Sequence, residues 1–246
     1  MVDKKIIVIT GGTTGIGFAC AEYLLEKGYE VIITGRSESN LSEALEKLNQ
    51  KATGFLSDTS KLSDIDELVS LVKEKFKKID GLFVNAGIFK ASSFEQTTEE
   101  IFDETMNINF KGAFFTAQKF VPIMNNPSSI VLNTSIVVFK VFADTSVYTA
   151  SKGAIESVAK VLNLELAQKG IRVNIISPGV TESPIHKKSG MSDDAIKNLL
   201  EHFSNSSPIG RIVQPKDIAP ILEFLVSDNS LVLRNEKIIV DGGTTM

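Results

Sequence analysis

The sequence predicts an α/β fold in which a seven-stranded parallel sheet is covered by helices on both faces. Two observations lead to this prediction. Short continuous apolar runs, typical of strands buried on both faces, alternate along the chain with longer segments whose apolar residues recur with a period of about 3.6. Strands that alternate with helices imply right-handed crossovers, and these build a parallel, doubly wound sheet. The expected strands are residues 5–10, 30–34, 53–57, 81–85, 129–134, 172–176 and 237–240.

The helices between these strands are expected from amphipathic patterns. The first strand leads through a glycine-rich turn into a helical pattern that begins at Phe18, a long helix follows Thr98, and another begins near Tyr148. Each buries one apolar stripe against the sheet. The clearest stripes are Leu62, Ile65, Leu68, Val69, Val72 and Phe76; Ile218, Ile221, Leu222 and Leu225; and Phe110, Phe114, Phe115 and Phe120, whose spacing fits core or subunit packing.

The chain is expected to form a single domain over residues 1–246, because no repeat, low-complexity tract or linker divides it. The least regular stretch is 178–215, and it leaves the carboxyl end of the sixth strand. Ligands bind at that edge of open parallel sheets. Residues 183–208, which contain a helical pattern at 194–203, are therefore a candidate substrate lid.

Composition argues against several classes of protein. The net charge is -4, and the densest basic stretch, 73–78, contains Glu74 on a helical pattern, which favours a solvated helix face over a nucleic-acid site. The opening segment has an apolar run of only four residues, 6–9, too short for a signal peptide or a membrane span. We therefore expect a cytoplasmic protein with no membrane or nucleic-acid partner.

Cysteine and histidine usage predicts neither disulfides nor a metal site. The single cysteine, Cys20, lies in a predicted helix and is expected to be buried. The only histidines are His186 and His202, and no cluster with metal-ligand spacing surrounds them. His186, Lys187 and Lys188 are expected on a mobile basic loop.

A glycine-rich turn follows the first strand and precedes a helix. It reads Thr10-Gly11-Gly12-Thr13-Thr14-Gly15-Ile16-Gly17, which is not the strict G-x-G-x-x-G spacing. Glycines permit a tight turn and close approach of the backbone to a ligand, while the helix N-terminus offers free N–H groups and a positive dipole end to a pyrophosphate. The turn predicts a Rossmann-type dinucleotide site, with an ordinary strand-to-helix turn as the alternative.

The end of the second strand predicts which dinucleotide is bound. An acid at this point would bind the ribose 2′-hydroxyl of NAD, whereas an arginine accepts the 2′-phosphate of NADP. The sequence here has Arg36 and Ser37 and no carboxylate. A guanidinium pairs bidentately with phosphate, so we expect NADP(H) rather than NAD(H), unless Arg36 is an ordinary surface residue.

Tyr148 and Lys152 are four residues apart at the start of a helical segment, which puts both side chains on one helix face. A free tyrosine has a pKa near ~10, and a neighbouring ammonium brings this pKa down toward the range useful for proton exchange. Structural packing is the alternative for this common spacing.

These motifs together resemble those of short-chain dehydrogenases/reductases. The resemblance spans essentially the whole chain, in order and in approximate spacing. It comprises the turn at 10–17, Asn85-Ala86-Gly87, Asn109, Ser135, the pair Tyr148 and Lys152, Pro178-Gly179 and Asp241-Gly242-Gly243.

The resemblance implies roles for four reacting groups. Tyr148 resembles the general acid/base that protonates the carbonyl oxygen, and Lys152 the group that lowers its pKa and holds the nicotinamide ribose. Ser135 resembles the hydroxyl that polarises the substrate carbonyl. Asn109 matches the asparagine of a water-mediated proton relay, although Asn107 lies only two residues away.

The resemblance also implies contacts to the cofactor, in addition to the turn residues Gly11, Thr13, Thr14, Gly15, Ile16 and Gly17. Asp58, with Thr59 beside it, resembles the carboxylate that binds the adenine amino group. Ser183 falls where the family usually has a threonine that bonds the nicotinamide carboxamide, and Thr181 is a second candidate. The remaining contacts implied are Asn85, Ala86 and Gly87 along the adenosine ribose, and Pro178, Gly179 and Val180 at one nicotinamide face.

Two segments depart from the family pattern. Residues 232–235 replace the usual Ile-Thr-Gly turn, and Asn235 is the residue there that best tolerates left-handed backbone. Residues 136–142 are more apolar than a catalytic loop needs, so they either line an apolar substrate pocket or only pack beneath the lid.

The expected function is hydride transfer between NADP(H) and a small carbonyl or alcohol substrate. The resemblance implies a homotetramer, because relatives commonly pair the long helix after Thr98 and the helix bearing Tyr148 across a two-fold axis, and a dimer is the alternative. Two alternatives to this function stay open. One is reduction of a 3-oxoacyl thioester on acyl carrier protein, which calls for a basic docking surface. The other is a regulatory protein that senses NADP(H) without chemistry, although four reacting groups argue against it.

Overall fold

The computed structural model of the protein describes residues 4–246. The first three residues of the opening segment discussed above lie outside the described residues. The seven strands form one parallel sheet of order β3-β2-β1-β4-β5-β6-β7. Their bounds are β1 (Ile6–Ile9), β2 (Glu30–Gly35), β3 (Thr53–Leu56), β4 (Ile79–Val84), β5 (Met124–Asn133), β6 (Ile171–Pro178) and β7 (Lys237–Val240).

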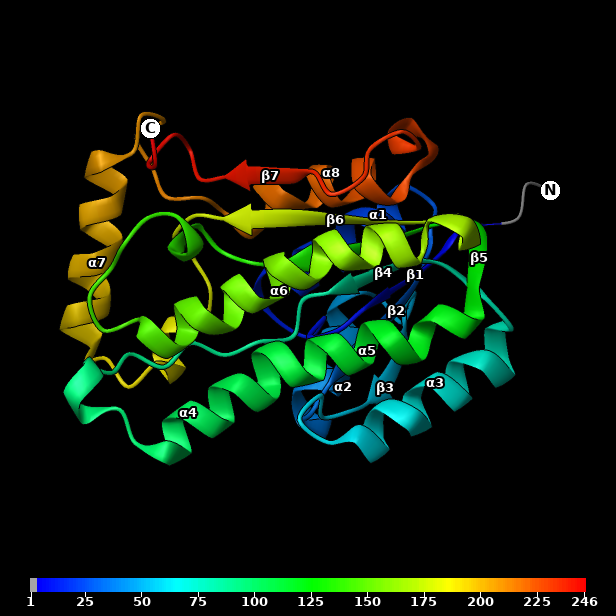
Figure 1. The fold of residues 1–246 in the computed structure, drawn as a ribbon, viewed down its shortest axis with the longest axis horizontal. Coiled ribbons are helices and arrows are strands. Elements are labelled where there is room, and N and C mark those ends of the chain that lie inside the picture. The colour runs from blue at the N-terminus through cyan, green and yellow to red at the C-terminus, as the bar shows by residue number, and fades with distance from the viewer. Residues whose placement is uncertain (1–3) are drawn as a thin grey trace.

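Helices cover both faces of this sheet (Figure 1). One apolar core lies under α1 (Gly15–Glu26), α2 (Glu38–Lys47) and α8 (Pro215–Val226). The other lies under α3 (Leu62–Phe76), α5 (Ala113–Phe120) and α6 (Ser146–Glu165). The predicted α/β class and doubly wound seven-stranded sheet are therefore confirmed.

The predicted strands differ from the observed ones only at their ends. The largest difference is at β5, which begins at Met124 instead of residue 129. The apolar stripes predicted on α3 and α8 are buried: Leu68, Val72, Leu222 and Leu225 are at most 2% exposed. Cys20 is fully buried on α1, as predicted, and burial raises the pKa of its thiol.

The strand order reverses between β1 and β4, and this reversal positions the site. The chain runs outward from β1 to β2 and β3, then returns to β4 on the other side of β1. The loops after β1 and β4 therefore diverge and leave a crevice at the carboxyl edge of the sheet, the usual position of a ligand in this architecture.

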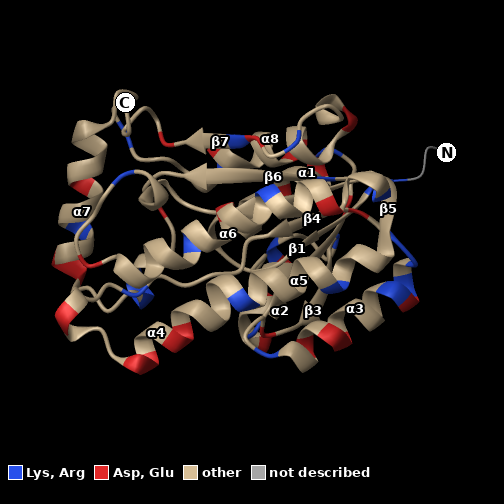
Figure 2. Cartoon of the chain, in the orientation of Figure 1, with Lys and Arg blue, Asp and Glu red and all other residues tan. Residues whose placement is uncertain are grey.

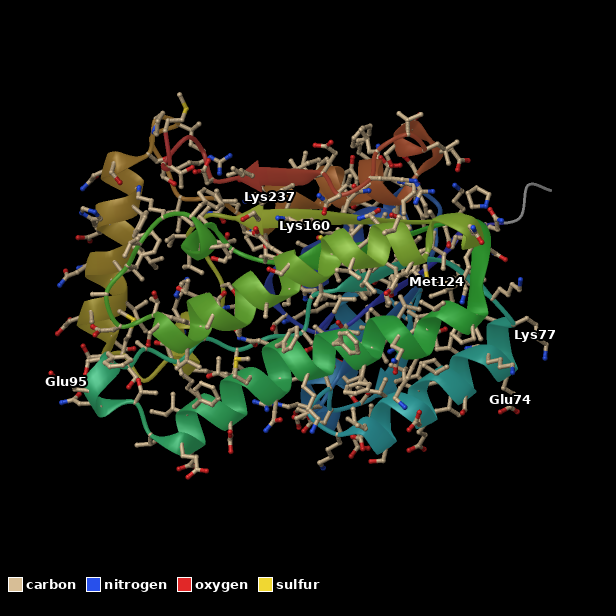
Figure 3. The ribbon with its side chains drawn as sticks, in the orientation of Figure 1. Glu74, Lys77, Glu95, Met124, Lys160 and Lys237 are labelled. Carbon is tan, nitrogen blue, oxygen red and sulfur yellow. The ribbon has the colours of Figure 1, made fainter. Side chains whose placement is uncertain are left out.

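The segment after β6 forms a helix at that edge. Helix α7 (Asp193–Ser206) extends the helical pattern expected at 194–203. It stands beside the arrowheads of β6 and β7, at the end of the molecule where the chain terminates (Figure 1). Glu95 lies at this end, whereas Lys77 and Met124 lie at the opposite end (Figure 3).

A π-helical segment interrupts the long helix that follows Thr98. Helix α4 (Glu99–Met106) continues through the segment Asn107–Gly112 into α5. Such a bulge adds one residue to a turn and often lies at a functional site. Gly112 is required here, because a Cβ would approach the Thr59 carbonyl oxygen to 2.5 Å.

Acidic and basic residues are interspersed over the helices (Figure 2). Within residues 4–246, none of the helices combines the length and apolarity needed to cross a bilayer. Over the same residues no three His, Cys, Asp or Glu side chains group closely enough to hold a metal ion.

Candidate functional site

The glycine turn leaves the first turn of α1 open to a ligand. The Thr14 side chain, at the N-cap, makes no capping hydrogen bond with the part of the chain that the structure describes. The N–H groups of that first turn therefore lack the usual side-chain acceptor. Gly11 and Gly15 have φ of 65° and 56°, and a Cβ on Gly15 would lie 2.7 Å from Ser183 Oγ. Glycine is thus required where the turn and the loop after β6 approach most closely.

A hydrogen-bond network behind the turn holds three strand ends together. Thr10 Oγ1 accepts hydrogen bonds from the backbone N–H groups of Asn85 and Ala86, at 3.0 and 3.1 Å. Asn85 Nδ2 donates to the carbonyl oxygens of Thr10 and Gly11, at 3.0 and 3.1 Å. Asn85 Oδ1 accepts from Asn133 Nδ2 at 2.8 Å. The ends of β1, β4 and β5 are therefore fixed relative to one another.

The end of β2 presents Arg36 and Ser37. Arg36 is exposed and lines the same cavity as the glycine turn. Ser37 Oγ caps α2 by accepting from Asn40 N–H at 3.4 Å. Among the described residues, the carboxylates that line the cavity are Asp58 and Asp144, and neither belongs to β2.

Three polar side chains converge from β5 and α6. Tyr148 and Lys152 lie on α6 one helical turn apart, as predicted from their spacing. Tyr148 lines the same cavity as Ser135, which follows the end of β5, and the Ser135 hydroxyl acts to lower the pKa of Tyr148. Lys152 Nζ donates to the Asn133 carbonyl oxygen at 2.9 Å and lies 5.8 Å from the centroid of the Tyr148 ring.

Burial shifts the pKa values of this pair. It raises the pKa of Tyr148 to about 12, and the Ser135 hydroxyl offsets only part of that rise. It also lowers the pKa of Lys152 to about 8. In the chain alone, desolvation of the charged forms dominates the pKa of both groups. The expected lowering of the Tyr148 pKa by Lys152 stays a prediction.

Asn109 lies behind these groups, in the π-helical segment. Its side chain is fully buried: Oδ1 accepts from Ile88 N–H at 2.8 Å, and Nδ2 donates to the Ile88 carbonyl oxygen at 3.0 Å and to Ser151 Oγ at 3.1 Å. Asn107, the alternative, is only partly buried. A Cβ on Gly87 would meet Asn109 Oδ1 at 3.1 Å and Lys152 Nζ at 3.5 Å, so these groups meet at one point.

One cavity of about 660 Å³ joins the glycine turn to the Tyr148 cluster. Three residues predicted for the site, Gly15, Gly17 and Asn109, do not line this cavity. They lie behind it and contact residues that line it. The predicted residues that line it are Gly11, Thr13, Thr14, Ile16, Arg36, Ser37, Asp58, Thr59, Asn85, Ala86, Gly87, Ser135, Tyr148, Lys152, Pro178, Gly179, Val180, Thr181 and Ser183.

The apolar segment 136–142 has a divided role. Ile136, Val137 and Phe142 line the cavity, whereas Phe139 and Val141 are 40% and 94% exposed on the outside. The two ends of the segment therefore line the cavity, while residues in its second half are exposed to solvent in the single chain.

One expectation about the segment after β6 is wrong. His186 was expected on a mobile basic loop, but it is only 9% exposed, and its Nε2 lies 3.0 Å from the Thr181 carbonyl oxygen. Burial of the ring and this bond account for the difference, and burial lowers the pKa of His186. By contrast, Asn235 adopts φ of 58°, so the divergent turn before β7 keeps its left-handed residue.

Several site residues were missed by sequence reasoning. Thr10 and Asn133 connect strand ends, and Ser151 binds Asn109. Their signal was adjacency to Gly11, Ser135 and Lys152, but side chains that bind other residues carry no motif of their own. Phe89, whose ring centroid lies 5.1 Å from that of Tyr148, was also missed.

Fold and site together define a doubly wound α/β oxidoreductase. A family sequence model described as "Enoyl-(Acyl carrier protein) reductase" matches residues 11–245, and the chain belongs to the short-chain dehydrogenase/reductase family, whose members use a nicotinamide cofactor.

Three similar proteins illustrate the range of this family. A solved "short-chain dehydrogenase/reductase SDR:glucose/ribitol dehydrogenase" from Brucella melitensis has a TM-score of 0.91 and 30% identity, covering 98% of this chain and 97% of its own. A 3-ketoacyl-(acyl-carrier-protein) reductase of the same organism, complexed with NADH, has a TM-score of 0.90 and 27% identity, covering 100% of both chains. A 3alpha-hydroxysteroid dehydrogenase of Mediterraneibacter gnavus is 32% identical, over 98% of this chain and 97% of its own.

Proposed function

We propose that the chain transfers a hydride between NADP(H) and a carbonyl or alcohol substrate, with Tyr148 as general acid/base. The observation that carries this proposal is the pairing of Tyr148 with Ser135 in the cavity that continues to the glycine turn. An uncharged hydroxyl pair beside a dinucleotide site suits a carbonyl oxygen that gains a proton as its carbon gains a hydride.

The residues of the cavity fit a nicotinamide dinucleotide. The open first turn of α1 would hold the pyrophosphate, Asp58 the adenine, and the segment from Pro178 to Ser183 the nicotinamide. When bound, the nicotinamide supplies the hydride, or accepts it in the oxidative direction. Arg36 at the end of β2 supports NADP(H), because its guanidinium can pair with a 2′-phosphate and no described carboxylate of β2 lines the cavity.

Tyr148 and Ser135 divide the work at the substrate oxygen. Ser135 would donate a hydrogen bond to the carbonyl oxygen, and Tyr148 would give it the proton. With a pKa of about 12, Tyr148 holds its proton at neutral pH, which suits reduction. Lys152 would help ionise Tyr148 in the oxidative direction and bind the nicotinamide ribose. Asn109 would support proton return through Lys152, and the approach of both side chains to Gly87 supports this role.

The quaternary structure and the lid also belong to this proposal. We propose a homotetramer, in which exposed apolar residues of α4 and α6 are covered: Phe102, Val161 and Leu164 are 48%, 53% and 80% exposed in the single chain. Light scattering after size exclusion tests this. We also propose that 183–208 acts as a lid within a single domain. A cytoplasmic location stays a prediction of the sequence.

The first test is NADPH oxidation by the purified protein with ketones, aldehydes, sugars and 3-oxoacyl thioesters, with NADH run in parallel. We expect turnover with NADPH. Faster turnover of thioesters than of any simple ketone would instead favour the acyl-thioester reductase. Tight NADPH binding without turnover of any compound would favour the regulatory protein.

A further inference from the structure

The part of the cavity beside Tyr148 has an apolar wall. It is formed by the loops after β4, β5 and β6 and by α7. Six side chains dominate it: Phe89, Val137, Phe142, Met191, Leu199 and Phe203.

The aromatic side chains of this wall are packed in fixed relation to the reacting group. Phe89 meets Tyr148 edge-on, with centroids 5.1 Å apart and planes at 67°. Phe142 and Phe203 pack together at 5.7 Å, and Phe203 is only 5% exposed. The rings therefore offer preformed apolar contact area in the cavity that Tyr148 lines.

One face of α7 completes the wall. Ala195, Leu199 and Phe203 follow one another at intervals of four, and all three line the cavity. The acidic and basic residues of α7, including Lys197 and Glu201, lie on its outer faces and are exposed.

Polar groups near this wall already bind other parts of the chain. Thr145 Oγ1 donates to the Phe142 carbonyl oxygen at 2.8 Å and lies 3.1 Å from Thr149 Oγ1. His186 Nε2 is bonded to Thr181. Beyond Ser135 and Tyr148, the polar groups left for a substrate are His186 Nδ1, which is buried without a partner among the described residues, and the charged residues at the rim. Hydroxyls of a polyol that face the six apolar side chains would be buried unpaired, which is unfavourable.

The charged residues at the rim do not select an anionic substrate. Asp144 and Lys188 both line the cavity, and backbone bonds from Ser92 to Asp144 (2.9 Å) and from Ala91 to Ser189 (3.1 Å) draw their two loops to the same edge. Opposite charges on neighbouring loops leave little net field for an anion.

Several basic residues that a carrier protein could meet are paired with acids in the described part of the chain. Lys90 pairs with Glu104 at 3.4 Å, Lys197 with Glu201 at 3.9 Å, and Arg211 with Asp217. Red and blue segments are mixed on α7 in Figure 2. An acidic carrier is attracted by a net positive patch, and these pairs reduce it, so that Lys187 and Lys188 are left as exposed bases of the loop after β6 without a carboxylate partner among the described residues.

We infer that the substrate of this site is a neutral, predominantly apolar ketone with a ring or branched body, or the matching secondary alcohol. This inference rests on the proposed function. In the reduction, the carbonyl carbon gains a hydride from the reduced nicotinamide and the oxygen gains the Tyr148 proton. The products are the secondary alcohol and the oxidised nucleotide, and Tyr148 regains its proton from solvent.

The test compares kcat/KM for 2-decalone, dihydroxyacetone and acetoacetyl thioesters, free and carried on acyl carrier protein. We expect 2-decalone to exceed dihydroxyacetone by about 100-fold, the effect of burying about three to four CH₂ groups at about 0.8 kcal/mol each. A higher kcat/KM for dihydroxyacetone or for either thioester would overturn the inference and leave the oxidoreductase function standing.

Two variants on α7 test whether the preference for an apolar ketone depends on the apolar wall. Leu199→Gln places an amide in the apolar wall, whereas Leu200→Gln makes the same change at a neighbour that does not line the cavity. We expect Leu199→Gln to lower kcat/KM for 2-decalone about tenfold and to leave the Kd of NADPH unchanged, while Leu200→Gln changes neither. Equal effects of both variants would contradict the inference.

A binding measurement separates failure of the inference from failure of the proposed function. Calorimetry of 2-decalone with the NADPH-loaded Tyr148→Phe protein reports binding without turnover. If no compound is reduced by the unchanged protein but 2-decalone still binds and Leu199→Gln weakens it, the proposed function fails and the apolar pocket stands. Absence of 2-decalone binding would overturn the inference whatever the activity.

Discussion

Lys152 Nζ donates its hydrogen bond to the backbone carbonyl oxygen of Asn133, at 2.9 Å. The Asn133 side chain in turn donates to Asn85, so this carbonyl is part of the network that fixes the strand ends. The ammonium is 5% exposed and has a neutral acceptor rather than a carboxylate as its partner. The charged form of Lys152 is therefore held in position at the cost of the desolvation free energy of its ammonium group.

That cost predicts a pH dependence of stability. The pKa of Lys152 is lowered from 10.5 to about 8 by burial, so below pH 8 the folded chain carries a buried ammonium. Between pH 8 and 10.5 the unfolded chain binds more protons, and stability contributed by this residue rises with pH. We expect the unfolding free energy of the unchanged protein, relative to Lys152→Met, to rise by up to about 3 kcal/mol from pH 7 to 10.

Urea titrations of the two proteins at each pH measure this difference, since other groups titrate alike in both. A difference that stays constant from pH 7 to 10 would show that the ammonium is well solvated when folded. A difference that falls would mean that Lys152 gains an anionic partner.

Removing the Tyr148 hydroxyl predicts loss of rate with retention of cofactor binding. Tyr148→Phe keeps the ring and its contact with Phe89. Without the proton donor, kcat should fall by about 100-fold or more. Steady-state rates, together with the Kd of NADPH, test this. Tyr23→Phe on α1, away from the cavity, is the matched control and should keep its rate. A Tyr148→Phe protein with more than about a tenth of the original kcat would remove Tyr148 from the mechanism.

The fold was accessible to sequence reasoning because its signal is repeated. Most strands contain a short apolar run, so runs such as Ile6–Ile9 locate the sheet even where their ends are displaced. The site residues were accessible because Tyr148, Lys152 and Ser135 need particular chemistry at particular spacing. The π-helical segment Asn107–Gly112 was not, since a single wide turn between two helices has no residue type or spacing that marks it.

The pKa shifts of Tyr148 and Lys152 could not be predicted from the sequence. The spacing of Tyr148 and Lys152 shows that they share a helix face, but desolvation depends on every neighbour that covers them. Likewise, Phe89 and Phe203 line one cavity only because the loop after β4 and helix α7, which are far apart in the chain, come together in the fold. Such three-dimensional neighbourhoods have no local pattern.

Arg36 predicts the cofactor preference. Arg36→Asp removes a phosphate partner and offers a carboxylate to a ribose hydroxyl. The ratio of kcat/KM with NADPH to kcat/KM with NADH should fall at least about tenfold, because a charged hydrogen bond contributes about 1.5–3 kcal/mol. Lys51→Asp makes the same change of charge at an exposed residue outside the cavity and should leave the ratio unaltered. An Arg36→Asp ratio equal to that of Lys51→Asp would exclude Arg36 from phosphate recognition.

Two glycine-to-alanine changes in helices predict effects of opposite sign. Alanine is favoured over glycine inside a helix by about 1 kcal/mol. At Gly153 on α6, no described atom beyond its chain neighbours and its own helix backbone lies within 4 Å of the added Cβ, so Gly153→Ala should stabilise the chain by about 0.4–1 kcal/mol.

At Gly17 on α1, the added Cβ would overlap the carbonyl oxygen of Gly11 and lie 2.7 Å from Asn85 Nδ2. Both atoms belong to the network that shapes the glycine turn, and neither can move without breaking hydrogen bonds. We expect Gly17→Ala to destabilise the chain by about 1–3 kcal/mol and to weaken NADPH binding at least tenfold. Thermal unfolding with and without NADPH measures both effects. A Gly17→Ala protein that gains stability, as Gly153→Ala should, and binds NADPH normally would mean that the turn relaxes freely and does not fix the pyrophosphate position.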